Sequence, residues 1–277
     1  MRRGPAPPRR SAVWLTCALS LLGCKSADHG VAPGPASGTT VAPSPSPTSP
    51  PPSAPPSAPP ERPPPAAPAS SASAGAPKQA YRIAAVGDSL TDTQSHGGGY
   101  LAYVQKRCPE TRIDNYGKGA LMLNQIRRRF EETVHNQPAG SYTHVIVWGG
   151  VNDVYSDLTA GRTPAKAEAD LSVIYEKTRN KGAKVVAITI SPWGGFARYY
   201  NERRQGYTLE VNQWIRDQLP LNKVDAVVDA YSLLSCGDPT KLCPEFTQRK
   251  SDGLHLGPKG HEVLGKALYD AAFSDCR

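Results

Sequence analysis

Short runs of apolar residues recur along the last two hundred residues of the chain, and segments with helical spacing of apolar positions separate them. The runs are YRIAAV (81–86), RIDNYG (112–117), HVIVWG (144–149), KVVAITI (184–190) and DAVVDA (225–230). The helical spacing covers 100–108, 121–134, 164–181, 207–218 and 259–272. Continuous apolar runs are typical of strands buried on both faces, and strands that alternate with helices form parallel sheets. The pattern predicts a three-layer α/β/α sandwich with a five-stranded parallel sheet over residues 78–277.

The N-terminal part of the chain does not show this pattern. Four arginines precede the apolar segment SAVWLTCALSLLG, which is too short to span a bilayer as a helix and is typical of a signal peptide. The segment ends in LLGC, which resembles the lipobox of bacterial lipoproteins. We therefore expect residues 1–23 to be a lipoprotein-type signal peptide and Cys24 to be lipidated. The alternative is an ordinary cleaved signal in which Cys24 has no role.

Between residues 31 and 77 the sequence is almost entirely Pro, Ala, Ser, Gly and Thr. Such a composition lacks the apolar side chains that a core requires, so residues 24–77 are predicted to be a disordered tether. Together with the leader, this tether predicts an exported protein that is lipid-anchored to the bacterial cell envelope, on the periplasmic or the surface face of the outer membrane. The lipid anchor would be its only contact with the membrane.

The basic charge of the chain does not indicate a nucleic-acid partner. Of the formal net charge of +8, four units belong to the arginines of the predicted leader, which leaves about +4 (8 − 4). The one tight basic run, 127–129, lies in a predicted helix and is typical of a solvated face. No nucleic-acid motif is present, and we expect a monomer.

Four cysteines remain once Cys17 leaves with the leader and Cys24 is assigned to the anchor: Cys108, Cys236, Cys243 and Cys276. Four cysteines in an exported domain predict two disulfides, for which three pairings are possible. The short separation of Cys236 and Cys243 favours that pair, which leaves Cys108 with Cys276. Their spacing does not resemble that of a metal site, and none is expected.

Residues with chemical potential follow the predicted strands, where ligands bind in open α/β sheets. Ser89 follows the first strand in GDSL, Gly117 the second in NYGKG, and Asn152 the third in GGVND. Asp252 and His255 lie before the last helix in SDGLHLGPKG. Each of these short motifs alone is equally consistent with turn or cap chemistry.

Taken together, these residues fit nucleophilic catalysis. A serine hydroxyl becomes nucleophilic when an imidazole accepts its proton, and a carboxylate fixes the tautomer of that imidazole. Asp252 lies three residues before His255, within reach of its near ring nitrogen, whereas the rival base His261 has no carboxylate one turn away. An oxyanion would find donors in the backbone N–H groups of Ser89 and Gly117 and in the amide of Asn152. Asp88 and Asp153 are expected to support their loops.

These four blocks, in this order, resemble the SGNH (GDSL) hydrolase family, over residues 81 to about 272. The resemblance implies a flavodoxin-like fold and a serine esterase. Ser89 would be the nucleophile, Asp252 and His255 would complete the triad, and Ser89, Gly117 and Asn152 would form the oxyanion hole. No cofactor is implied.

The substrate is less constrained than the reaction. Aromatic and basic residues follow the fourth strand and would lie beside the cleft in such a fold: Trp193, Phe196, Arg198, Tyr199, Tyr200, Arg203, Arg204 and Tyr207. They favour a sugar chain, although they could equally pack their own helix. We expect an esterase that removes a small acyl group, such as acetyl, from a cell-wall or extracellular carbohydrate. The alternatives are a lipase or lysophospholipase, an acyltransferase that uses the same acyl-enzyme, and a non-catalytic binding module.

Overall fold

A computed structural model of the chain describes residues 79–248 and 252–276. The predicted leader (1–23), the lipidation site Cys24 and the predicted tether (24–77) lie outside the described residues. Within the described ranges, no helix is long and apolar enough to cross a membrane.

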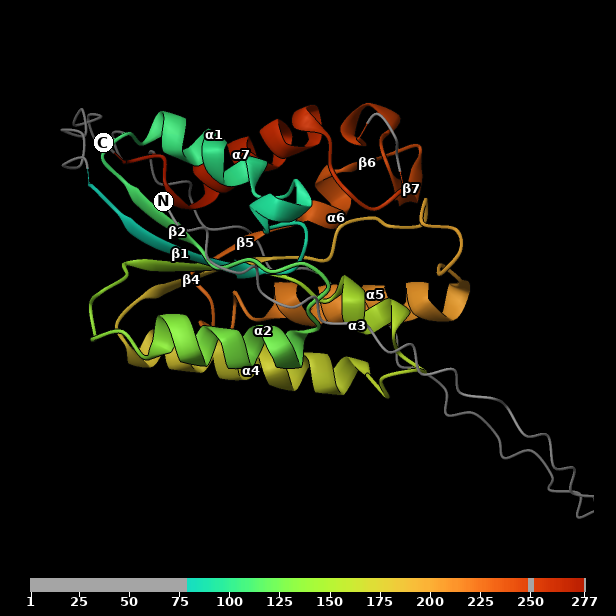
Figure 1. Cartoon of the computed structure of the whole chain (residues 1–277), viewed down its shortest axis with the longest axis horizontal. Coiled ribbons are helices and arrows are strands. Elements are labelled where there is room, and N and C mark those ends of the chain that lie inside the picture. Colours follow the sequence, from blue (N-terminus) through green and yellow to red (C-terminus); the bar gives the residue numbers. More distant parts are fainter. Residues whose placement is uncertain (1–78, 249–251, 277) are drawn as a thin grey trace, which may run out of the picture. The chain divides into compact units, whose positions relative to one another are not determined.

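Five parallel strands form the central sheet, in the order β2-β1-β3-β4-β5 (Figure 1). They are β1 (Arg82–Gly87), β2 (Arg112–Asn115), β3 (His144–Trp148), β4 (Lys184–Ile188) and β5 (Ala226–Val228). Because all five strands are parallel, their carboxyl ends lie at one edge of the sheet. The predicted sheet is confirmed, and each predicted segment overlaps one strand.

Alternate residues of the strands supply two separate cores. On β1, Ile83 and Ala85 pack into one core and Ala84 and Val86 into the other. The same alternation continues on β3 and β4. This explains the consecutive apolar residues 83–86, 145–148 and 185–188 of the three inner strands, since a strand with helices on both sides has no solvent face.

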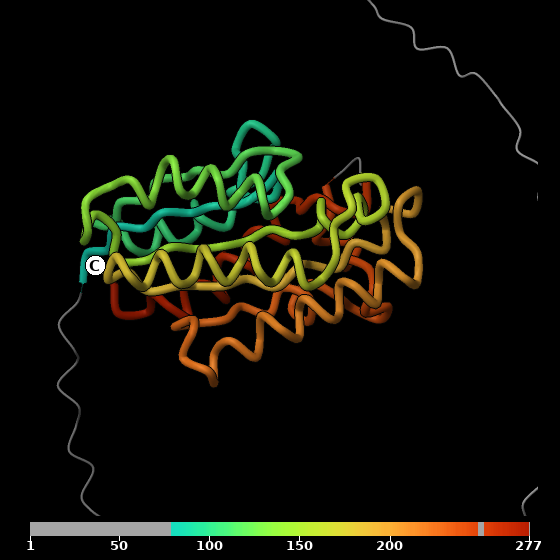
Figure 2. Tube along the Cα trace, turned by 90° about the horizontal axis from the view of Figure 1, so that it is seen from below, coloured from blue at the N-terminus to red at the C-terminus, as the bar shows by residue number. Residues whose placement is uncertain are grey.

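Helices cover both faces of the sheet (Figure 1). One face carries α1 (Gly99–Arg107), α6 (Ala230–Leu233) and α7 (Pro258–Ala272). The other carries α2 (Leu123–Phe130), α3 (Val151–Tyr155), α4 (Pro164–Asn180) and α5 (Glu202–Asp217). Figure 2 shows this second face, with α4 lying between α2 and α5.

Local chemistry accounts for where the helices begin and end. Thr163 caps α4 by accepting a hydrogen bond from the Lys166 N–H, and Pro164 occupies the first turn, where a missing N–H costs nothing. Asn201 caps α5 in the same way, so this helix begins five residues before the predicted 207. The predicted helix 121–134 is shorter than expected, because α2 ends at Phe130 and continues as a π-helical turn, η2 (Glu131–His135).

Several short elements were not predicted from the sequence. They are α3, α6, the 3-10 turns η1 (Thr93–Ser95) and η3 (Pro244–Phe246), and the hairpin β6 (Ser235–Cys236) with β7 (Asp238–Leu242). Elements this short carry too few apolar positions to show a period.

Both favoured disulfide pairings are confirmed. Cys236–Cys243 closes the β6–β7 hairpin, and Cys108–Cys276 links the end of α1 to the C-terminal segment across 168 positions of sequence. The second bridge joins the first and last parts of the described fold on the α1/α7 face.

Candidate active site

Ser89 lies in a tight turn directly after β1. The backbone N–H groups of Thr91 and Asp92 donate to the Asp88 carbonyl, and the Leu90 N–H donates to Asp88 Oδ1 at 3.0 Å. Gly87 must be a glycine, because a Cβ there would lie 2.3 Å from the Trp148 carbonyl oxygen. The chain therefore turns within two residues of the strand end and leaves Ser89 half-buried at the sheet edge.

Ser89, His255 and Asp252 form one hydrogen-bonded triad. Ser89 Oγ lies 2.9 Å from His255 Nε2, and His255 Nδ1 lies 2.6 Å from Asp252 Oδ2. The residues come from opposite ends of the domain, 166 positions apart in sequence. With the proton of the ring on Nδ1 and shared with Asp252, Nε2 is free to accept the proton of the serine hydroxyl.

Asp252 is held in its ionised form. Its burial opposes ionisation, but the His255 N–H, the His255 ring and the Leu254 N–H outweigh this, and the pKa of Asp252 is lowered. The two backbone donors contact Oδ1 at 2.9 and 3.0 Å, so that Oδ2 faces the imidazole. The carboxylate therefore fixes both the tautomer and the orientation of His255.

His261, the rival base, has a different environment. Its side chain is buried against Tyr100, with the two rings stacked at 6.4 Å. Burial lowers the pKa of His261, and its Nδ1 has no hydrogen-bond partner within residues 79–248 and 252–276. It is a packed residue of α7, and it is His255 that contacts Ser89.

The expected oxyanion donor Gly117 lies close to the Ser89 turn. A Cβ at Gly117 would lie 2.6 Å from the Asp92 nitrogen, so only glycine permits this approach. However, its N–H already has an acceptor, because it donates to Asn115 Oδ1 at 2.8 Å. Asn115 in turn donates to the Thr91 carbonyl at 2.7 Å. The N–H of Gly117 would therefore have to be shared with Asn115, or released by it, to reach an oxyanion.

The second expected donor, Asn152, lies in the first turn of α3. Its Nδ2 donates one hydrogen to the Leu121 carbonyl at 2.9 Å, which leaves the second hydrogen of the amide for another acceptor. The side chain is almost fully buried. Gly150, the residue before α3, has φ of 117°, which a glycine adopts without strain and which lets the helix start directly after β3.

Asp88 and Asp153 are both fully buried. Burial raises the pKa of Asp88 to about 7, and its Oδ2 has no hydrogen-bond partner among the described residues. Burial also raises the pKa of Asp153, but both of its oxygens accept hydrogen bonds, from the Leu123 N–H and from Arg162. Asp88 accepts from the Leu90 N–H of its own loop, as the sequence predicted, whereas Asp153 contacts the start of α2 and not its own loop.

The aromatic loop after β4 lies beside the Asp252–His255 loop. Gly195 and Gly253 pack against each other so closely that a Cβ at Gly195 would lie 2.8 Å from the Gly253 Cα. Phe196 and Tyr199 pack on Tyr155, a residue of α3, at ring separations of 6.2 and 5.5 Å. This half-buried group of three rings, which we call the aromatic wall, joins the loop to the helix that carries Asn152.

Two side chains of the predicted aromatic and basic group, Trp193 and Tyr207, are buried, which makes them wrong as substrate contacts. Trp193 has no exposed surface, and its Nε1 donates to Thr208 at 2.9 Å. It belongs to the core beneath the loop, where it packs on Tyr200 at 5.2 Å. Arg198 is exposed and lies 5.4 Å from the ring of Tyr199. Of the predicted group, six side chains remain partly accessible: Phe196, Arg198, Tyr199, Tyr200, Arg203 and Arg204, of which the last two pair with Asp157.

A groove of about 810 Å³ lies between α1 and α7. Its lining includes His96, Ala102, Tyr103 and Leu256. Ser89, His255 and Asp252 do not line the groove, but Leu256, which does, directly follows His255. The groove therefore lies next to the serine–histidine–aspartate triad and does not enclose it.

Sequence reasoning missed Asn115, which ties the Gly117 loop to the Ser89 turn. The available signal was its position at the carboxyl end of β2, the same rule that identified the other residues. It also missed Tyr155, whose position beside the aromatic loop depends on how α3 packs.

The fold and the site together define a class: a three-layer α/β protein with a hydrogen-bonded serine, histidine and aspartate at the carboxyl edge of a parallel sheet. The sequence model of the GDSL-like lipase/acylhydrolase family matches residues 85–263. The chain belongs to this family, and it is an ester-cleaving hydrolase.

Solved structures agree with this family. A GDSL-like lipase from Bacteroides thetaiotaomicron is 20% identical, with a TM-score of 0.56, and the match covers 69% of this chain and 86% of that one. A lipase/acylhydrolase from Enterococcus faecalis is 21% identical with the same TM-score, over 69% and 94% of the two chains. The acetyl xylan esterase AlAXEase is 21% identical, with a TM-score of 0.55, over 68% and 98%. A comparison with curated protein sequences found no match.

Proposed function

We propose that this protein is a serine esterase that removes a small acyl group, such as acetyl, from a cell-wall or extracellular carbohydrate. The observation that supports this reaction is the hydrogen-bonded triad of Ser89, His255 and Asp252, with contacts of 2.9 and 2.6 Å. These are the distances at which a general base activates a hydroxyl and is itself oriented.

In the first step, Ser89 Oγ attacks the carbonyl carbon of the ester while its proton passes to His255 Nε2. The carbonyl oxygen becomes an oxyanion, which the Ser89 and Gly117 N–H groups and the Asn152 amide would stabilise. The bond to the leaving alcohol then breaks, and the alcohol oxygen takes the proton from His255. Ionised Asp252 stabilises the imidazolium while it carries this proton.

In the second step, water attacks the acyl-enzyme and gives its proton to His255. A second oxyanion forms and collapses, the bond to Ser89 Oγ breaks, and Ser89 recovers its proton. Both steps use only groups of this chain and water. If another hydroxyl took the place of water, the same site would act as an acyltransferase.

The aromatic wall supports a carbohydrate as the carrier of the acyl group. Rings of Phe196, Tyr199 and Tyr155 gather between the Asn152 helix and the Asp252–His255 loop, with the exposed Arg198 beside them. Flat apolar faces next to a cation suit sugar rings, acidic ones included. The structural likeness to an acetyl xylan esterase is consistent with this substrate class.

We also propose that the enzyme is exported and lipid-anchored through Cys24. The apolar leader segment, the LLGC sequence and the Pro/Ala/Ser-rich stretch of the first 77 residues support this localisation. A cell-envelope or extracellular polymer would then be within reach of a domain on a long tether.

A series of acyl esters and one polymer test the proposal. Turnover should fall from acetate through butyrate to octanoate, and Tyr199→Ala should reduce activity on an acetylated polysaccharide roughly ten-fold while changing 4-nitrophenyl acetate turnover little. This follows because contacts remote from the reacting bond contribute only when the polymer is present. Tyr269→Ala, on the distant α7, is the matched control. Equal losses on both substrates would refute a sugar-binding role for the aromatic wall.

The α1/α7 groove favours a second candidate, an esterase of longer acyl chains. Ala102 and Leu256 are among its lining residues, and Leu256 directly follows His255 in the chain. Each methylene buried there would add about 0.8 kcal/mol. A preference for octanoate over acetate, lost selectively in Ala102→Trp, would establish this candidate and refute the acetyl proposal.

A further inference from the structure

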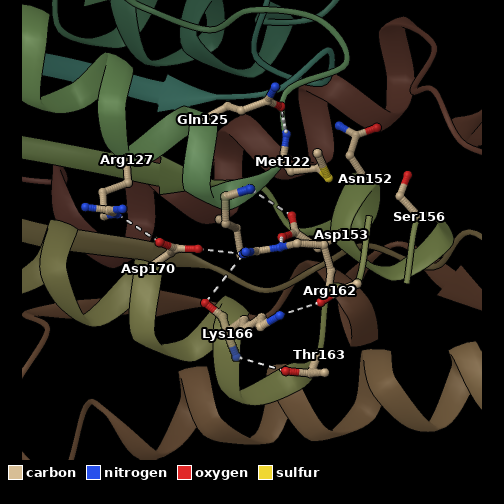
Figure 3. Close-up of polar contacts among 12 residues, drawn as sticks. Met122, Gln125, Arg127, Asn152, Asp153, Ser156, Arg162, Thr163, Lys166 and Asp170 are labelled. Carbon is tan, nitrogen blue, oxygen red and sulfur yellow. Dashed lines mark hydrogen bonds and ion pairs between the residues drawn. The ribbon is translucent and has the colours of Figure 1, made fainter. Parts of the chain in front are cut away.

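An ion-pair network contacts α3, the helix that carries Asn152. Asn152 and Asp153 are adjacent in the first turn of α3, and their side chains leave the helix in different directions (Figure 3). Asn152 would face the oxyanion. Asp153 faces the interior, where Arg162 Nε donates to its Oδ1 at 2.6 Å.

The side chains of Asn152 and Asp153 both form hydrogen bonds with the backbone of one neighbouring segment, residues 121–123. Asn152 Nδ2 donates to the Leu121 carbonyl at 2.9 Å, and Asp153 Oδ2 accepts from the Leu123 N–H at 2.8 Å. This segment continues from the loop that carries Gly117. The orientation of the first turn of α3 therefore determines where the Asn152 amide lies relative to the Gly117 loop.

Arg162 links this turn to α4. While Nε contacts Asp153, Nη2 donates to Asp170 Oδ2 at 2.5 Å (Figure 3). Arg162 and Asp170 are each only 8% exposed, and Asp153 is fully buried. Arg162 directly precedes Thr163, the cap of α4, so its backbone position is fixed as well.

The ion pairs that Arg162 makes with Asp153 and Asp170 are buried, so both carboxylates depend on a well-placed cation. Burial raises the pKa of Asp153 and the neighbouring Asp170 raises it further, whereas the Arg162 guanidinium between the two carboxylates lowers it. A guanidinium fits because its fork reaches two acceptors at fixed angles, which an ammonium does not do. The structure thus places one arginine where it determines the position of Asp153.

We propose that Arg162 is a positioning residue for the oxyanion hole: through Asp153 it fixes the first turn of α3, and with it the Asn152 amide, against the Leu121–Leu123 segment. It does not touch the substrate. The inference rests on the oxyanion role proposed above for Asn152.

A double-mutant cycle tests the coupling in the full chain, with 4-nitrophenyl acetate as the substrate. Asn152→Ala should lower kcat roughly 100- to 1,000-fold, as the loss of one oxyanion donor does. Arg162→Met should lower kcat roughly 10- to 100-fold with KM nearly unchanged, because a small displacement of a donor weakens transition-state stabilisation. Added to Asn152→Ala, it should lower kcat less than three-fold further, since the donor it positions is already gone.

Arg127→Met is the matched control. Arg127 donates to the other oxygen of Asp170 at 2.8 Å and makes no contact with Asp153 among the described residues, so kcat should stay within two-fold of the wild type. Arg162→Lys should lie between the wild type and Arg162→Met. If Arg162→Met does not fold, Arg162→Lys replaces it in the cycle.

The outcomes separate this inference from the proposed function. If Ser89→Ala remains active, the proposed function itself is wrong. If Ser89→Ala is inactive but Arg162→Met lowers kcat equally with and without Asn152, or no more than Arg127→Met does, the positioning role is refuted and the esterase stands. A cycle in which the effect of Arg162→Met disappears with Asn152 supports the inference.

Discussion

The substitution Asp252→Asn tests the catalytic geometry most directly, because it changes one atom of the acceptor that faces His255. Asp252 Oδ1 accepts two backbone N–H groups, at 2.9 and 3.0 Å, and Oδ2 accepts from His255 Nδ1 at 2.6 Å. In asparagine, one of these two positions becomes an NH₂ group, which cannot accept. The backbone provides two donors and the imidazole one, so the amide oxygen should turn toward the backbone and the NH₂ group toward His255.

This orientation reverses the tautomer of the imidazole. An NH₂ group facing Nδ1 requires Nδ1 to be the acceptor, which places the ring proton on Nε2, facing Ser89. The base can then no longer accept the serine proton. An aspartate-to-asparagine change in a serine–histidine–aspartate triad lowers kcat about 10⁴-fold. That factor corresponds to about 5 kcal/mol of transition-state stabilisation, and we expect a loss of this size.

The assay is kcat/KM for 4-nitrophenyl acetate at pH 7.5, with Ser89→Ala as the floor. Asp270→Asn is the matched control, because Asp270 pairs with Lys266 on the surface of α7. Thermal unfolding of both variants checks that the fold is intact. If a folded Asp252→Asn kept more than a tenth of the wild-type kcat/KM, the reasoning would be refuted.

Two further predictions concern stability. Burial raises the pKa of Asp88 to about 7, so the folded state favours the neutral acid, and the free energy of unfolding should fall as pH rises from about 4 to about 7. Asp88→Asn should gain stability relative to the wild type between pH 5 and pH 8, by up to on the order of 4 kcal/mol in urea unfolding, and a gain independent of pH would contradict the shift. Replacing both Cys108 and Cys276 by alanine should destabilise the domain more than replacing Cys236 and Cys243, because the sequence separations are 168 and 7. Loop entropy gives roughly 5 against 2 kcal/mol, and denaturation midpoints in the opposite order would contradict the entropic account.

Much of the fold and of the serine–histidine–aspartate triad could be predicted from the order of residues along the chain. The inner strands β1, β3 and β4 carry consecutive apolar residues because helices cover both of their faces, and this makes them visible in the sequence. The strand-end rule then led to Ser89, Gly117 and Asn152, and the short spacing of Asp252 and His255 led to the base. Each of these signals is local.

What could not be predicted depends on packing between distant segments. Trp193 and Phe196 are three residues apart in an aromatic loop, yet one is fully buried and the other half-buried. Composition cannot separate them, because the side chain that is covered depends on how the loop meets α5. The engagement of Gly117 by Asn115 was missed for a related reason, since a backbone N–H leaves no mark in a sequence.

The amino-acid sequence by itself determined the order of strands and helices, the residues at the strand ends and the pairing favoured for the cysteines, because these follow from periodicity and from spacing along the chain. The tertiary structure alone decided which side chains meet: Ser89 with His255 across 166 positions, and Arg162 between Asp153 and Asp170. Hydrogen bonds and ion pairs depend on distances of about 3 Å between atoms. Only the packing of α3, α4 and the C-terminal loop on one sheet brings those atoms within such distances.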